Sequence, residues 1–98
     1  MVMANARKIV TGNITFGTQS EQLPSVEIPG GFYVILKPRR TNVGAIFLGD
    51  SMASANSVNG NYQLEPLDPP LFLKISNLDL LFCRGTANDV LSWIVEKY

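Results

Sequence analysis

The chain lacks histidine altogether and has a single cysteine, Cys83, among its 98 residues. One cysteine cannot form an intrachain disulfide, and without histidine the usual Cys/His metal sites cannot be built. Cys83 lies in the apolar stretch LDLLFCRG, which favours a small core residue over a reactive thiol. The composition therefore predicts a fold held together by packing, with no metal and no cofactor.

Charged residues are also scarce. Eight basic and eight acidic side chains make up 16% of the chain and give a net charge of zero. Soluble domains typically carry about 25% charged residues. Without a net positive field, nucleic acid is not an expected partner. So little charge leaves apolar or neutral surface, which we expect a partner protein to cover.

Long hydrophobic runs are missing as well. No segment approaches the ~18 apolar residues of a membrane helix. The first residues, MVMANARKIVTGN, do not contain the apolar stretch of a secretory signal. We therefore expect neither a membrane partner nor a secretory leader.

Short apolar segments separated by turn residues are what the chain does contain. Glycine, proline, asparagine and aspartate recur at intervals of roughly 8–12 residues, as in β-sandwiches and barrels. The segments between them are rich in β-branched and aromatic residues, which favour strands. We predict strands within residues 8–18, 31–37, 43–49, 71–76, 78–84 and 89–98.

The last segment, DVLSWIVEKY, has a helical alternative in which Asp89 caps the first turn. Its β-branched and aromatic content favours a strand. In that reading Leu91, Trp93 and Val95 share one face.

Together these segments predict an all-β protein, a small antiparallel β-sandwich of the jelly-roll or immunoglobulin-like kind with about 7–8 short strands. We expect residues 9–98 to form a single domain after a flexible N-terminal arm at 1–8. Residues 32–36 and 90–95 are apolar on both strand faces. Such strands lie in the middle of a structure or at a subunit interface, so we expect a homo-oligomer.

Gly49-Asp50-Ser51, after the apolar run AIFL, looks like the nucleophile block of GDSL esterases and lipases. A serine nucleophile needs a positioned base and an oxyanion hole. Histidine is absent, and the Ser-x-x-Lys alternative fails because Ser54 occupies the lysine position. We predict that Ser51 is not catalytic, that the protein is not an enzyme, and that the side chains of Asp50 and Ser51 cap a turn.

Several polar and aromatic residues are candidates for contacts with a partner. Arm residues 1–8 are predicted to add a strand to a neighbour, and Arg39 and Arg40 to make polar contacts near a strand end. A carbohydrate-binding platform is an alternative role for Trp93, Tyr62 or Tyr98. The candidate contact residues are Arg7, Lys8, Tyr33, Arg39, Arg40, Tyr62 and Tyr98.

Turn motifs between residues 22 and 96 resemble those of small virion structural proteins of tailed bacteriophages. The motifs are PGGFYVILKPRRTN, Gly49-Asp50-Ser51, the polar stretch from Asn59-Gly60 to Leu64-x-Pro66, Asn77-Leu78, Gly85-Thr86-Ala87-Asn88-Asp89 and Ser92-Trp93. The sequence departs from that group at Leu67-Asp68-Pro69-Pro70, where a glycine-containing turn is usual, and at Asn88, where glycine is common.

The resemblance implies a capsid decoration (cement) protein, a homotrimer, that binds the major capsid protein and stabilises the shell. Its location would then be the virion, which is assembled in the host cytoplasm. A tail, baseplate or fibre-base component is the alternative within the same group. A carbohydrate-binding module is the alternative outside it.

Overall fold

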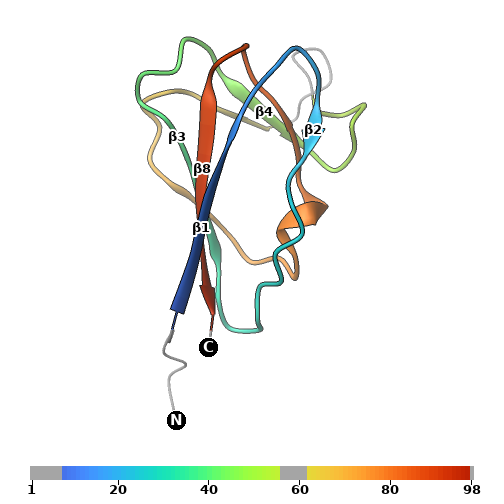
Figure 1. Cartoon of the computed structure of the whole chain (residues 1–98), viewed down its shortest axis with the longest axis vertical. Coiled ribbons are helices and arrows are strands. Elements are labelled where there is room, and N and C mark those ends of the chain that lie inside the picture. Colours follow the sequence, from blue (N-terminus) through green and yellow to red (C-terminus); the bar gives the residue numbers. More distant parts are fainter. Residues whose placement is uncertain (1–7, 56–61, 98) are drawn as a thin grey trace.

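The computed structural model describes residues 8–55 and 62–97 and is almost entirely β-structure (Figure 1). The elements in chain order are β1 (Lys8–Thr15), β2 (Glu21–Gln22), β3 (Val34–Pro38), β4 (Ile46–Gly49), β5 (Tyr62–Leu64), β6 (Leu71–Leu73), the 3-10 turn η1 (Leu78–Leu80), β7 (Phe82–Arg84) and β8 (Val90–Lys97). The predicted all-β class is therefore confirmed. The final segment is a strand, as its β-branched composition indicated.

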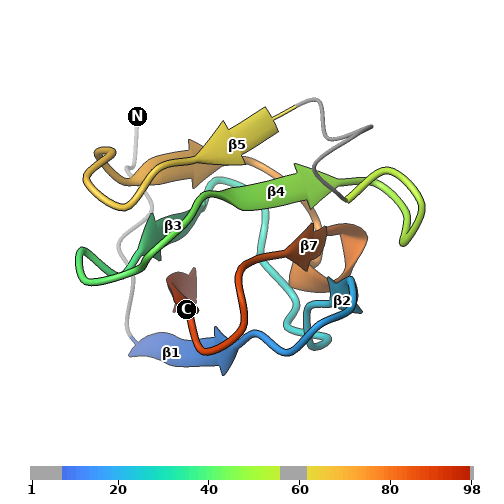
Figure 2. The ribbon, with the colours of Figure 1, turned by 90° about the horizontal axis from the view of Figure 1, so that it is seen from above.

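The strands form two four-stranded sheets, in the orders β1-β8-β3-β6 and β2-β7-β4-β5, which Figure 2 shows from above. All pairings are antiparallel. The first strand pairs with the last, the second with the seventh, the third with the sixth and the fourth with the fifth. This nested pairing is the topology of a jelly roll, one of the two sandwich types predicted from the sequence.

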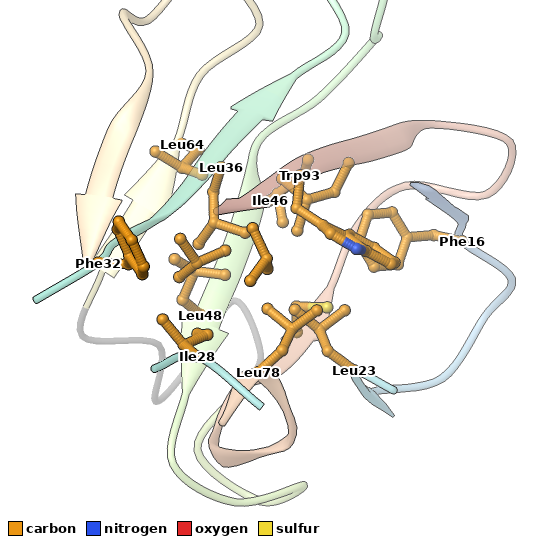
Figure 3. Packing of buried hydrophobic residues seen from close by; sticks show 14 residues of the cluster. Phe16, Leu23, Ile28, Phe32, Leu36, Ile46, Leu48, Leu64, Leu78 and Trp93 are labelled. Atoms are coloured by element: carbon orange, nitrogen blue, oxygen red, sulfur yellow. The ribbon is translucent and has the colours of Figure 1, made fainter. Parts of the chain in front are cut away.

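The core lies between the two sheets (Figure 3). Side chains alternate along each strand, so Val34 and Leu36 of β3 are fully buried, and the residues opposite them on β8, Val95 and Trp93, are buried as well. The opposite sheet contributes further side chains to the same cluster, among them Ile46, Leu48, Leu64 and Cys83.

Trp93 is 6% exposed because its indole lies over Gly12, the residue directly opposite on β1. A Cβ atom at position 12 would stand 2.7 Å from Cζ2 of the indole. Phe16 packs in the same way against Gly85, where an added Cβ would lie 2.5 Å from Cδ2 of the ring. Glycine is required at both positions to let an aromatic ring approach the backbone.

Two details of the sequence prediction are wrong. The segment 78–84 is not one strand: it begins as the 3-10 turn η1, because Asn77 Oδ1 accepts from Asp79 N at 3.1 Å and from Val26 N at 3.0 Å. Lys8 is the first residue of β1 and not the end of an arm, because it pairs with Lys97 of β8. The rest of the predicted arm lies outside the described residues.

Candidate binding surface

The solvent-facing side of the sheet β1-β8-β3-β6 carries a row of aligned side chains. Ile94 of β8 is opposite Thr11 of β1 on one side and Ile35 of β3 on the other, and Ile35 is opposite Phe72 of β6. Phe72 is 58% exposed and Ile94 is 38% exposed. Strand neighbours such as Leu36 point into the core, so these side chains face solvent. An apolar band therefore crosses the sheet on its outer side.

Two further residues extend this band. The ring of Tyr33 meets that of Phe72 edge to face, with centroids 6.4 Å apart and planes at 78°. Ile9, near the start of β1, is also exposed. We call this surface, formed by Ile9, Tyr33, Ile35, Phe72 and Ile94, the outer face.

The outer face is hollowed between β3 and β8. A depression of about 250 Å³ is lined by Ile35, Lys37, Pro70, Ser92, Trp93 and Ile94. Its lining is mostly apolar, and Lys37 and Ser92, the two polar residues beside it, are too few to recognise a small polar ligand. The surface is better suited to apolar side chains of another protein. Lys37 and Glu96 lie on either side of the row formed by Thr11, Ile94, Ile35 and Phe72.

The predicted contact residues do not converge on one place. Tyr33 belongs to the outer face, and Lys8 is exposed at the start of β1. Arg39 and Arg40 are exposed in the turn after β3. Tyr62 is exposed on β5, which belongs to the other sheet. Arg7 and Tyr98 lie outside the described residues.

Sequence reasoning missed Ile9 and Phe72 as surface residues. The sequence did indicate the outer face, because residues 32–36 and 90–95 are apolar on both faces of their strands. Phe72 lies between Leu71 and Leu73, whose side chains are half-buried on the inner side of β6. Three consecutive apolar residues in a strand place at least one of them on the solvent side.

Trp93 does not join a sugar-binding platform. Its indole is buried against Gly12 on the inner side of its sheet. Tyr62 is exposed, but on the opposite sheet. The described aromatic residues of the carbohydrate hypothesis are thus not brought together.

Ser51 belongs to a hydrogen-bonded turn. The hydroxyl of Ser54 accepts from Asp50 N at 3.0 Å and from Ser51 N at 3.1 Å, and it lies 3.0 Å from Asp50 Oδ1. Ser51 Oγ accepts from Ser54 N at 3.2 Å and contacts Ser54 Oγ at the same distance. Ser51 Oγ therefore caps the turn as predicted, but the Asp50 carboxylate accepts from the Ser54 hydroxyl instead of a backbone N–H, and Ser54 takes the role predicted for Asp50. No base contacts Ser51 Oγ among the described residues.

Cys83 is fully buried in β7, opposite Glu21 of β2. Burial, followed by the nearby charge of Glu21, raises the pKa of the Cys83 thiol to about 12. The thiol therefore stays protonated at neutral pH, and only the thiolate is strongly nucleophilic. Cys83 is a core residue, in agreement with the prediction.

A second apolar depression, of about 290 Å³, lies where β4, β5 and β6 meet η1. Its lining residues are Leu48, Gly49, Asp50, Tyr62, Leu71, Leu73, Leu80 and Leu81. Within residues 8–55 and 62–97, no group of three or more cysteine, aspartate or glutamate side chains is placed to hold a metal ion. Over the same residues no helix is long and apolar enough to cross a membrane.

No protein-family model, no curated protein and no solved structure matches this chain.

Proposed function

We propose that the protein is a non-enzymatic structural protein of a phage particle, a capsid decoration protein that binds the major capsid shell and stabilises it. The outer face carries this proposal. It presents Tyr33, Phe72 and Ile94 to solvent around an apolar depression, as a surface made to be covered by another protein does. The virion as location is supported by the resemblance of the turn motifs. The jelly roll, which many viral capsid proteins and lectins share, supports it only at the level of fold.

Attachment through the outer face would be driven by burial of apolar surface. Fully covering one large apolar side chain contributes about 1.5–3 kcal/mol. A few such residues give each copy a modest interface, and many symmetric copies stabilise a shell collectively. Arg39 and Arg40 would add polar contacts near the end of β3.

The mode of attachment predicts a weak dependence on salt. Apolar burial is not screened by ions, whereas exposed charge pairs are. Decoration held by the outer face should therefore persist when the ionic strength is raised. Release at moderate salt would point instead to attachment through Arg39 and Arg40.

Two other assignments of the sequence stay predictions. A tail, baseplate or fibre-base component would have the same fold and could use the same outer face. The homotrimer likewise stays a prediction from the sequence, and it competes with the pairing of two copies that is inferred below. The carbohydrate-binding alternative is weakened, because Trp93, the largest aromatic residue proposed for it, is buried in the core.

The proposal is tested on particles purified from the phage or prophage that encodes this chain. A gold-labelled antibody against the purified protein is applied, and the particles are viewed by electron microscopy. Label spread over the heads is the expected result. Label confined to tails would replace decoration by the tail assignment. Particles that lack the chain altogether, as judged by mass spectrometry, would overturn a structural role.

A further inference from the structure

Among the strands that the structure describes, β1 is a long edge with no partner on its outer side. It spans eight residues, Lys8–Thr15, and lies at the end of its sheet. The other three edge strands, β6, β2 and β5, are only three, two and three residues long. A long edge presents a row of backbone donors and acceptors that another strand can satisfy.

The backbone bonds of Phe16, the residue after β1, show which N–H and C=O groups of β1 face away from β8. Phe16 N donates to Asp89 O at 2.9 Å, and Phe16 O accepts from Asn88 N at 2.8 Å, so the backbone of Phe16 faces the β8 side. Backbone direction alternates along a strand, and the β1–β8 register is continuous. The residues whose N–H and C=O groups face away from β8 are therefore Ile9, Thr11, Asn13 and Thr15.

Beyond Lys8, residues 9–15 of this edge have none of the features that usually prevent strand addition. Such features are proline, a bulge, or a charged side chain directed inward. β1 contains no proline, its pairing with β8 has no bulge, and its one charged residue is Lys8 at the first position. The sequence KIVTGNIT is instead rich in β-branched residues, which favour pairing.

We propose that β1 pairs antiparallel with β1 of a second copy, about a twofold axis at Gly12. The segment VTGNI has the same chemical pattern in both directions from Gly12: a polar residue and then an aliphatic one. About this axis Thr11 lies opposite Asn13 of the second copy, and Val10 lies opposite Ile14. The two copies of β1 thus contribute the same residues to the contact, as a twofold axis requires.

The register agrees with both the hydrogen bonds and the packing. Ile9 would lie opposite Thr15 and Thr11 opposite Asn13, so every outward-facing residue of β1 gains a partner for its N–H and C=O groups. Val10 and Ile14 are half-buried on the inner side of the edge. Pairing would cover them with the same two residues of the second copy. The two sheets β1-β8-β3-β6 would become one continuous sheet.

This contact is independent of the proposed attachment to a shell, because it uses the edge and leaves the outer face free. Purified protein therefore suffices for the test. Light scattering over a range of concentrations should give the mass of two copies of the 10.7 kDa chain. A single copy at all concentrations, or three copies, would overturn the proposal.

Thr11→Pro provides the decisive variant. It removes an outward N–H that makes no bond to β8, and proline is tolerated in an edge strand where the N–H faces solvent. The mass should fall from two copies to one while the far-UV circular dichroism is unchanged. Thr11→Val, which keeps the N–H and the β-branched shape, should remain at two copies. A Thr11→Pro protein that retains the mass of two copies would refute the contact.

Hydrogen exchange tests the same contact without a substitution. In a lone chain the amides of Thr11 and Asn13 face solvent and exchange quickly. In the proposed pair their protection should rise with protein concentration, because association is bimolecular. Fast exchange of both amides at the highest concentration would rule the pairing out.

Discussion

The side-chain amide of Asn42 bonds both backbone groups of Val90. Asn42 Oδ1 accepts from Val90 N at 2.8 Å, and Asn42 Nδ2 donates to Val90 O at 2.9 Å. The preceding residue, Asp89, is 4% exposed, and its carboxylate accepts from Val43 N and Gly44 N, each at 2.9 Å. These four bonds fix the loop after β3 to the start of β8. Together with the backbone bond from Arg39 N to Val90 O, they continue the attachment of β3 to β8 beyond the end of β3.

Replacing Asn42 by alanine should destabilise the fold. Val90 is buried, so its N–H would lose its partner, whereas its C=O would retain Arg39 N as a donor. A buried donor left unsatisfied costs about 1–3 kcal/mol. Urea unfolding should show this loss for Asn42→Ala and a change below about 0.5 kcal/mol for Thr41→Ala, an exposed neighbour. Equal stability of the two variants would contradict this role of Asn42.

Gly12→Ala should also be destabilising, for a steric reason. The new methyl group would meet the Trp93 indole at 2.7 Å, so ring or backbone must move. Overpacking of this kind typically costs about 1–3 kcal/mol. Gly17→Ala is the matched control, because nothing lies within 4 Å of the added atom. The prediction fails if both substitutions shift the urea midpoint equally.

The buried thiol of Cys83 predicts a pH dependence. Its pKa is raised from about 9 to about 12 on folding, so the unfolded chain loses this proton at lower pH than the folded one. The contribution to stability is complete below about pH 9 and is lost as the pH rises from 9 towards 12. Wild-type protein should therefore lose stability faster over this range than Cys83→Ala. Parallel pH profiles would show that the thiol is not the cause.

Ser51 should not react as an activated serine. Its hydroxyl contacts Ser54 and no base among the described residues, so a fluorophosphonate probe should label wild type and Ser51→Ala equally. Label on Ser51 that disappears in the alanine variant would reverse the non-enzymatic assignment.

Local patterns predicted the longer strands well. Alternation of Leu91, Trp93 and Val95 follows from the two-residue period of a strand, and it is visible without tertiary information. β2 and β5 were not predicted, because EQ is polar and both EQ and YQL are too short to show an alternating pattern. They are strands only because β7 and β4 offer pairing partners.

Turn chemistry was predicted in part. Asn88 adopts a left-handed conformation, with φ at 76°, which glycine adopts readily and asparagine tolerates better than most residues. The 3-10 turn after Asn77 was missed because one of the bonds that fix Asn77 goes to Val26, 51 residues away. Contacts over such distances leave no periodic trace in a sequence.

The sequence indicated that an apolar surface exists, but it did not indicate where on the fold this surface lies. Apolar residues on both faces of two segments indicated surface to be covered. The alignment of Ile94, Ile35 and Phe72 depends on the register of three strands, which only the fold provides. The burial of Trp93 likewise depends on a glycine opposite it.

The most direct test of the account is the occupancy of outer-face variants on purified phage heads. The double variant Phe72→Glu, Ile94→Glu changes two exposed side chains, so it should fold normally. Burying its charges in an interface costs more than about 1.4 kcal/mol, so occupancy should fall about tenfold or more. Met52→Glu, at an exposed apolar residue outside the outer face, should bind like wild type. Undiminished occupancy of the double variant would contradict the claim that the outer face attaches this protein to its assembly.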